Sequence, residues 1–69
     1  MVEVYKTNVQ EVAQSEILIQ HLLEHYPNGK INFDLEDCDC ILRIAAHNVT
    51  HETVIALLAR HGYCCEVLS

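Results

Sequence analysis

The stretch INFDLE, residues 31–36, alternates apolar and polar side chains without interruption. Ile31, Phe33 and Leu35 lie on one side of the extended chain, and the polar residues between them lie on the other. A period of two is typical of a β-strand that has one buried face and one face in water. We therefore predict a strand from Ile31 to Leu35, and the segments on either side of it determine the fold.

Five further segments complete the predicted secondary structure. In chain order they are a strand at 2–7, a helix of about fifteen residues that ends before Pro27, a strand at 41–46, a helix from Thr50 to Gly62, and a strand at 63–68. This order predicts one α+β domain, residues 1–69, with the ferredoxin-like βαββαβ open sandwich. In this fold two helices cover one face of a four-stranded antiparallel sheet, so the other face stays open.

The helices carry capping signals as well as apolar periodicity. Asn8 with Glu11 has the spacing of a capping box, and Ser15 is a second candidate for the start of the first helix. Thr50 is the predicted N-cap of the second helix, and Gly62 is its predicted C-terminal cap glycine. The predicted inward faces are Leu18, Leu22 and Tyr26 on the first helix, and Val54, Leu57 or Leu58, and His61 on the second.

Composition argues against several classes of protein. The formal net charge is -6, with only four basic residues scattered singly, and such a chain repels nucleic-acid phosphates. The longest uncharged run, Ile17 to Leu23, is far shorter than the ~20 apolar residues that span a bilayer, so we expect no membrane segment. The first residues alternate like a strand and show no export signal, from which we expect a cytoplasmic protein with reduced thiols.

Four stretches resemble the heavy-metal-associated domains, the family of the copper chaperones and of modules appended to metal-pumping ATPases. They are Tyr5–Val9, Ile31–Leu35, Ile41–Ile44, and Val54–Leu58 followed by His61-Gly62-Tyr63. The family binds soft metal ions through a Cys-x-x-Cys loop, which by position falls at Glu11 and Gln14 here. A carboxylate and an amide are hard ligands that suit Cu(I) poorly, so we expect neither residue to bind it. The resemblance thus implies a degenerate member that retains the fold and docks to partner domains of similar shape.

The four cysteines are the candidate metal ligands. The predicted topology brings Cys38, Cys40, Cys64 and Cys65 towards one end of the sheet, where thiolates could hold Cu(I) or Zn. Cys40 and Cys64 would lie roughly 10 Å apart across two strand spacings, which is too far for one shared ion unless the loops fold inwards. In the alternative interpretation, Cys40 and Cys65 are small core residues and the other two are exposed thiols.

Two weaker patterns concern histidines and acids. His21 and His25 stand four residues apart on one helical face and form a potential chelating pair, but the sequence shows no third ligand for them. The alternative is that both are solvated surface histidines. Residues 36–39 read as a solvated acidic turn without the length of a calcium loop.

No catalytic motif is present, so we expect no enzyme activity. Three functions stay open, and the first is a protein-interaction module without a cofactor, whose partner is another protein or a second copy in a homodimer. The apolar content of 51% motivates the homodimer, because it exceeds what one helix-covered sheet face can hide. The second is a soft-metal binder or carrier that uses the four cysteines. The third is a regulatory domain that binds a small metabolite near residues 8–14.

Overall fold

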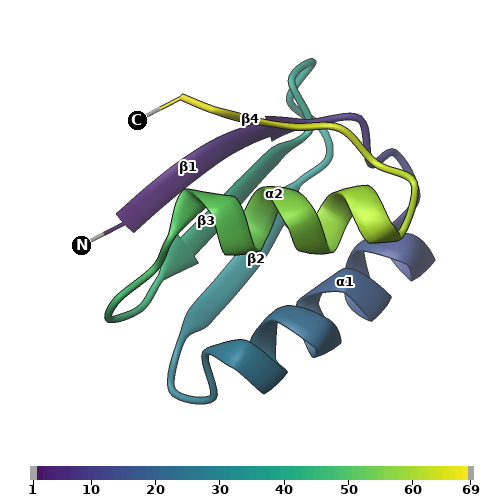
Figure 1. The fold of residues 1–69 in the computed structure, drawn as a ribbon. Helices are drawn as coiled ribbons and strands as arrows, with labels where there is room; N and C mark the ends of the chain where they lie inside the picture. The colour runs from purple at the N-terminus through teal and green to yellow at the C-terminus, as the bar shows by residue number, and fades with distance from the viewer. Residues whose placement is uncertain (1, 69) are drawn as a thin grey trace.

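The computed structural model describes residues 2–68, which form two helices and one four-stranded antiparallel sheet (Figure 1). The elements are β1 (Val2–Thr7), α1 (Val12–His25), β2 (Lys30–Asp34), β3 (Ile41–Ala45), α2 (His51–Arg60) and β4 (Cys65–Val67). The strand order is β2-β3-β1-β4, and both helices cover the same face of the sheet (Figure 1). The predicted α+β ferredoxin-like open sandwich is confirmed.

β1 lies inside the sheet, between β3 and β4. Tyr5 on β1 stands opposite Leu42, and Leu42 stands opposite Phe33 on β2, so these three side chains project from one face. Tyr5 and Leu42 are fully buried, which identifies this face as the one beneath the helices. The buried core cluster consists of Tyr5, Val9, Leu18, Leu22, Leu42, Ile44, Val54, Leu57 and Leu58.

Three strands differ from the predicted bounds. β2 begins and ends one residue earlier than predicted, at Lys30 and Asp34, β3 ends one residue early at Ala45, and β4 covers only Cys65–Val67. The amide of Tyr63 donates to the carbonyl of Leu58 at 2.9 Å and therefore belongs to the end of α2 rather than to the sheet. The predicted pairing of the first and last strands is confirmed, since Thr7 stands opposite Cys65.

α1 begins at Val12, and both starts predicted for this helix were wrong. Asn8 does not cap the helix, because its Oδ1 accepts the backbone N–H of Cys64 at 2.8 Å. Ser15 lies inside the helix and donates to the carbonyl of Val12 at 2.7 Å. Glu11 occupies the N-cap position without a side-chain hydrogen bond. Asn8, the best capping residue nearby in the sequence, is hydrogen-bonded to Cys64 instead.

α2 follows the prediction at its ends and departs from it on its inner face. Thr50 is the N-cap residue, and Gly62 has a φ of +86°, the left-handed conformation that ends a helix at little cost only for glycine. Three members of the predicted inner face are buried, namely Val54, Leu57 and Leu58. His61 is exposed, so its assignment to the core was wrong. The helix ends at Arg60, and the chain has left the helical path by the next residue.

Candidate functional site

One end of the sheet gathers the loop before α1, the turn between β2 and β3, and the start of β4. The amide of Thr7 donates to the carbonyl of Asp39 at 3.0 Å, and the Thr7 hydroxyl donates to the carbonyl of Cys40 at 2.6 Å. The bond between Cys64 and Asn8 joins the third segment to the first. The sequence correctly placed both cysteine pairs at this end.

The four thiols differ in exposure as the core interpretation expected. Cys40 is buried, Cys65 is half-buried, and Cys38 and Cys64 are exposed. Burial raises the pKa of the Cys65 thiol to about 11, which disfavours the thiolate that a metal ion needs. Among residues 2–68, one group of three potential metal ligands has all of its ligand atoms within 4.8 Å of one another. Cys38 is the single cysteine in that group. The structure therefore does not bring the four cysteines together.

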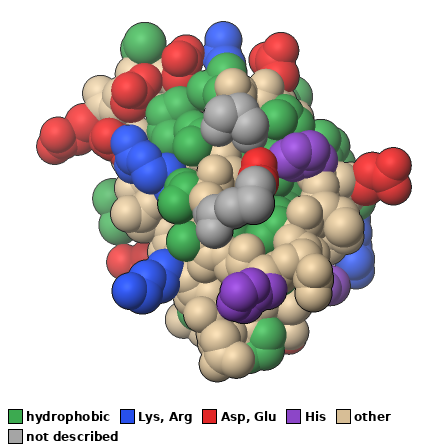
Figure 2. Space-filling model, turned by 90° about the vertical axis from the view of Figure 1, so that its left-hand side faces the viewer, with side chains coloured by type: hydrophobic (Ala, Val, Ile, Leu, Met, Phe, Trp, Pro, Cys, Tyr) green, Lys and Arg blue, Asp and Glu red, His purple; other side chains and the backbone are tan. Residues whose placement is uncertain are grey.

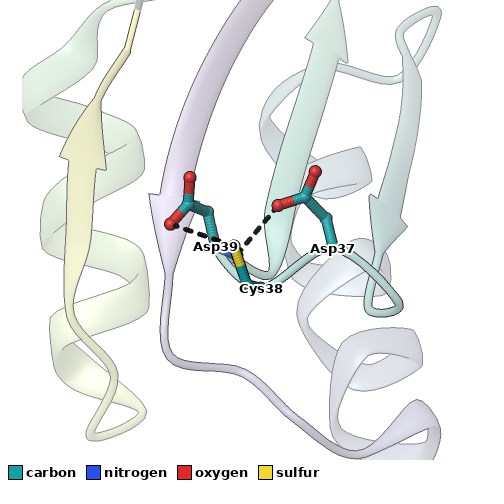
Figure 3. Close-up of side chains that lie close together, drawn as sticks. All are labelled: Asp37, Cys38 and Asp39. Atoms are coloured by element: carbon teal, nitrogen blue, oxygen red, sulfur yellow. Dashed lines mark hydrogen bonds between the residues drawn. The ribbon is translucent and has the colours of Figure 1, made fainter.

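The group that contains Cys38 is a surface turn (Figure 3). Asp37 accepts the backbone N–H of Asp39 at 2.9 Å, and the thiol of Cys38 lies 4.0 Å from a carboxylate oxygen of Asp39. Asp39 also lies 3.7 Å from Nζ of Lys6. These contacts are those of an Asx turn with an ion pair at its edge, and they account for all three side chains.

The two positions at which the sequence resemblance would place a metal loop are polar and exposed. Glu11 and Gln14 are both exposed, on either side of the start of α1. A hollow of about 320 Å³ lies beside this loop, and it is lined by Lys6, Thr7, Asn8, Cys64, Cys65 and Glu66. Of residues 8–14, near which the sequence suggested a metabolite cleft, Asn8 lines this hollow.

Tyr5, His51 and Glu3 form a polar chain between β1 and the start of α2. The fully buried Tyr5 has its hydroxyl 2.8 Å from Nδ1 of His51, and Nε2 of His51 lies 3.9 Å from a carboxylate oxygen of Glu3. Burial, and then the charge of Glu3, raises the pKa of Tyr5 to about 12, so the phenol that shares this hydrogen bond stays protonated. A buried phenol cannot reach a substrate, and the chain therefore acts as a structural link.

The packing of α1 against the end of α2 brings His21 and His61 together, a contact that the sequence did not predict. The ring centroids of His21 on α1 and His61 after α2 lie 4.6 Å apart. Nδ1 of His21 lies 3.3 Å from a carboxylate oxygen of Glu24. These residues line a groove of about 360 Å³ together with His25, Leu57 and Arg60. No local pattern predicts this contact, because His61 follows α2, whereas His21 lies on α1.

No helix or strand within residues 2–68 covers the face of the sheet opposite the helices, which is called the open face below. The strand registers place Lys30, Asn32, Asp34, Ile41, Arg43, Ala45, Val2, Val4, Lys6 and Glu66 on it, with Leu68 beside Val4. Val2 and Leu68 are 55% and 49% exposed, which is high for large apolar side chains. A hollow of about 260 Å³ at Ala45 is bordered by Val2, Lys30, Ile31, Asn32 and Arg43.

Charge is distributed unevenly between the two sides of the molecule. Three of the four basic residues, Lys6, Lys30 and Arg43, lie on the open face. Arg43 lies 3.6 Å from Asp34, and Lys6 stands opposite Glu66 as well as near Asp39. Figure 2 views the side of the molecule on which β1 begins and β4 ends, where hydrophobic side chains gather and Lys and Arg side chains lie towards the edges of the view. The open face is thus close to neutral in an acidic protein.

Comparisons with protein-family models, with curated proteins and with solved structures find no match for this chain. Neither helix within residues 2–68 has the length and apolar character needed to cross a bilayer. The geometry of the chain itself is therefore the basis for a functional proposal.

Proposed function

We propose that this chain is a non-enzymatic protein-interaction module of heavy-metal-associated-like fold, which docks through its open face to a second copy of itself. The observation that carries this proposal is the set of exposed apolar side chains, above all Val2 and Leu68, on a sheet face that no helix or strand within residues 2–68 covers. The proposal includes a cytoplasmic location, in which the four thiols stay reduced.

Apolar burial supplies the driving force for this association. Removal of apolar surface from water is worth about 25 cal/mol per Å², so covering Val2, Val4 and Leu68 favours the dimer. The hollow at Ala45 offers a partner's apolar side chain a place to insert. Four strands at ~4.8 Å spacing and five residues at ~3.3 Å give a face of roughly 19 by 17 Å, so we expect a small interface with micromolar affinity.

Charge favours this face over every other surface for contact between two copies. The net charge of -6 makes random encounters between copies repulsive. On the open face, Lys6, Lys30 and Arg43 offset the carboxylates of Asp34, Asp39 and Glu66. Two open faces can therefore approach each other without the repulsion that the acidic helix layer would generate.

Sedimentation equilibrium under reducing conditions tests the proposal. We expect the apparent mass to rise from 7.9 kDa towards twice that value across the micromolar range. Val2→Glu should weaken association by about tenfold or more, because a buried unpaired carboxylate costs far more than the 1.4 kcal/mol that tenfold represents. Leu68→Glu should have a similar effect.

Ile17→Glu is the matched control, because Ile17 is 54% exposed against 55% for Val2 but lies on α1. It should leave association unchanged, and circular dichroism should show that all three variants are folded. A mass that stays at 7.9 kDa at every concentration contradicts self-association. Equal weakening by Val2→Glu and Ile17→Glu contradicts the choice of face.

A further inference from the structure

The groove between the ends of the two helices contains a set of side chains with the chemistry of a metal site. Histidine nitrogens and carboxylate oxygens are common ligands of Zn²⁺ and related divalent ions. His21 and Glu24 come from one turn of α1, and His61 comes from the C-terminal end of α2. His25 lines the same groove one turn further along α1. None of the roles described above involves these four side chains.

The spacing of His21 and Glu24 fits one ion. At a metal–ligand distance of about 2.1 Å, two ligand atoms on a tetrahedral zinc ion lie roughly 3.4 Å apart. The contact between Nδ1 of His21 and the Glu24 carboxylate is 3.3 Å. The rings of His21 and His61 have centroids 4.6 Å apart, so side-chain rotations can bring their nitrogens to the required separation.

Exposure allows these rotations. The side chain of His21 is 45% exposed and that of Glu24 is 72% exposed, so neither is fixed in a packed core. The three ligand groups are not closed within 4.8 Å of one another as they stand, unlike the turn at Cys38. Binding therefore has to draw His61 inwards by a small movement of its side chain.

We propose that His21, Glu24 and His61 bind a divalent transition-metal ion, with Zn²⁺ as the probe ion, and that His25 or water fills the fourth position. The ion ties α1 to the end of α2 and so stabilises the helix layer, independently of any association through the open face. Arg60 lines the same groove and opposes a cation there, which limits the affinity. This site shares no residue with the cysteines or with the loop at Glu11 and Gln14.

Titration of Zn²⁺ into the reduced full-length chain, followed by calorimetry and by the NMR signals of the histidine rings, tests the proposal. We expect one equivalent to bind and the ring signals of His21 and His61 to shift, while His51 stays unchanged. His21→Ala and His61→Ala should each weaken binding by about tenfold or more. His47→Ala is the matched control, since His47 is an exposed histidine outside the groove, and it should bind as the unmodified chain does.

Two further variants separate the proposal from its competitors. Replacement of both exposed thiols, Cys38→Ser with Cys64→Ser, should leave zinc binding intact, and its loss there would assign the ion to the cysteines and overturn the proposal. Arg60→Gln should strengthen zinc binding several-fold, because it removes the competing cation. Weaker binding in Arg60→Gln, or no binding by the unmodified chain at millimolar Zn²⁺, would also overturn it.

Discussion

The hydroxyl of Tyr5 links the buried core to the start of α2 through one hydrogen bond. Its ring is fully buried, and its hydroxyl has His51 as its hydrogen-bond partner at 2.8 Å. Within residues 2–68, no buried side-chain nitrogen or oxygen lacks a partner. A buried polar group that loses its hydrogen-bond partner costs its full desolvation free energy. Loss of this bond should therefore destabilise the protein by more than the net contribution of the bond.

His51→Ala should therefore lower the free energy of unfolding by about 1–3 kcal/mol, because it leaves the Tyr5 hydroxyl without a hydrogen-bond partner. Urea denaturation at pH 7 measures the effect. His47→Ala, at an exposed residue, should change stability by less than about 0.5 kcal/mol. The double variant Tyr5→Phe with His51→Ala should lose less than the two single losses together, and strict additivity would show that the bond does not contribute.

The same residue and Cys65 predict a loss of stability in alkaline solution. Burial raises the pKa of Cys65 from 9.0 to about 11, and burial with the charge of Glu3 raises the pKa of Tyr5 from 10.0 to about 12. The folded state thus holds both protons more tightly than the unfolded state does. The stability that these two protonated groups contribute is fully present below pH 9.0 and is lost as the pH rises through their folded-state pKa values.

Urea midpoints measured from pH 8 to pH 12 should fall in two overlapping steps. Cys65→Ala should remove the step between pH 9.0 and about 11, and Tyr5→Phe should remove the step between pH 10.0 and about 12. An unchanged profile in both variants would show that other groups cause the alkaline loss.

At the scale of the element, α1 lacks a capping side chain. Glu11 has the extended backbone of an N-cap residue, with φ -108° and ψ 135°, but makes no side-chain hydrogen bond to the helix. Aspartate at this position keeps the charge and has the shorter side chain that N-cap bonding favours. The start of α1 is therefore not stabilised by a side-chain cap. Shortening the Glu11 side chain by one methylene group would give it the length that N-cap bonding favours.

Glu11→Asp should raise the free energy of unfolding by about 0.5–1 kcal/mol through a new bond to the first-turn amides. Chemical denaturation measures this gain. Glu16→Asp makes the same change inside the helix and should lower stability by a few tenths of a kcal/mol, because aspartate is a poorer helix former. A loss of stability in both variants would mean that the backbone at Glu11 does not accept a capping side chain.

At the scale of the whole molecule, net charge and size set how association responds to salt. The Debye length is about 30 Å at 0.01 M salt and about 10 Å at 0.1 M. The molecule measures 27 × 22 × 18 Å, so at low salt every acidic group of one copy acts on the other. The open face itself is nearly neutral, and its contribution changes little with salt.

Dimerisation should therefore strengthen when the ionic strength rises from 0.01 M to 0.1 M, as the repulsion between two charges of -6 is screened. Sedimentation equilibrium at the two salt concentrations measures the change. Glu52→Gln removes one charge from α2, and it should reduce this salt dependence without affecting the open face. Weakening by salt would instead indicate an interface held by ion pairs.

Local periodicity in the sequence was sufficient for the order of elements and for most of the core. The alternation at residues 31–36 predicted β2 to within one residue at its end, and spacing by four predicted the buried Leu18 and Leu22. The conformation of Gly62 was predictable because only glycine adopts a φ of +86° at little cost. These features depend on neighbours a few residues apart, which is the range that a sequence pattern describes.

The tertiary structure alone decided which polar groups meet. Asn8 is a good capping residue by local rules, but Cys64, 56 residues away, takes its side chain. Tyr5 and His51 meet across 46 residues, and His61 leaves the predicted inner face to lie beside His21. Each outcome depends on how two elements pack against each other, and short polar side chains satisfy whichever partner the packing supplies. The sequence by itself determined the sheet, the helices and their apolar contacts, whereas packing determined the histidine groove and the separation of the four thiols.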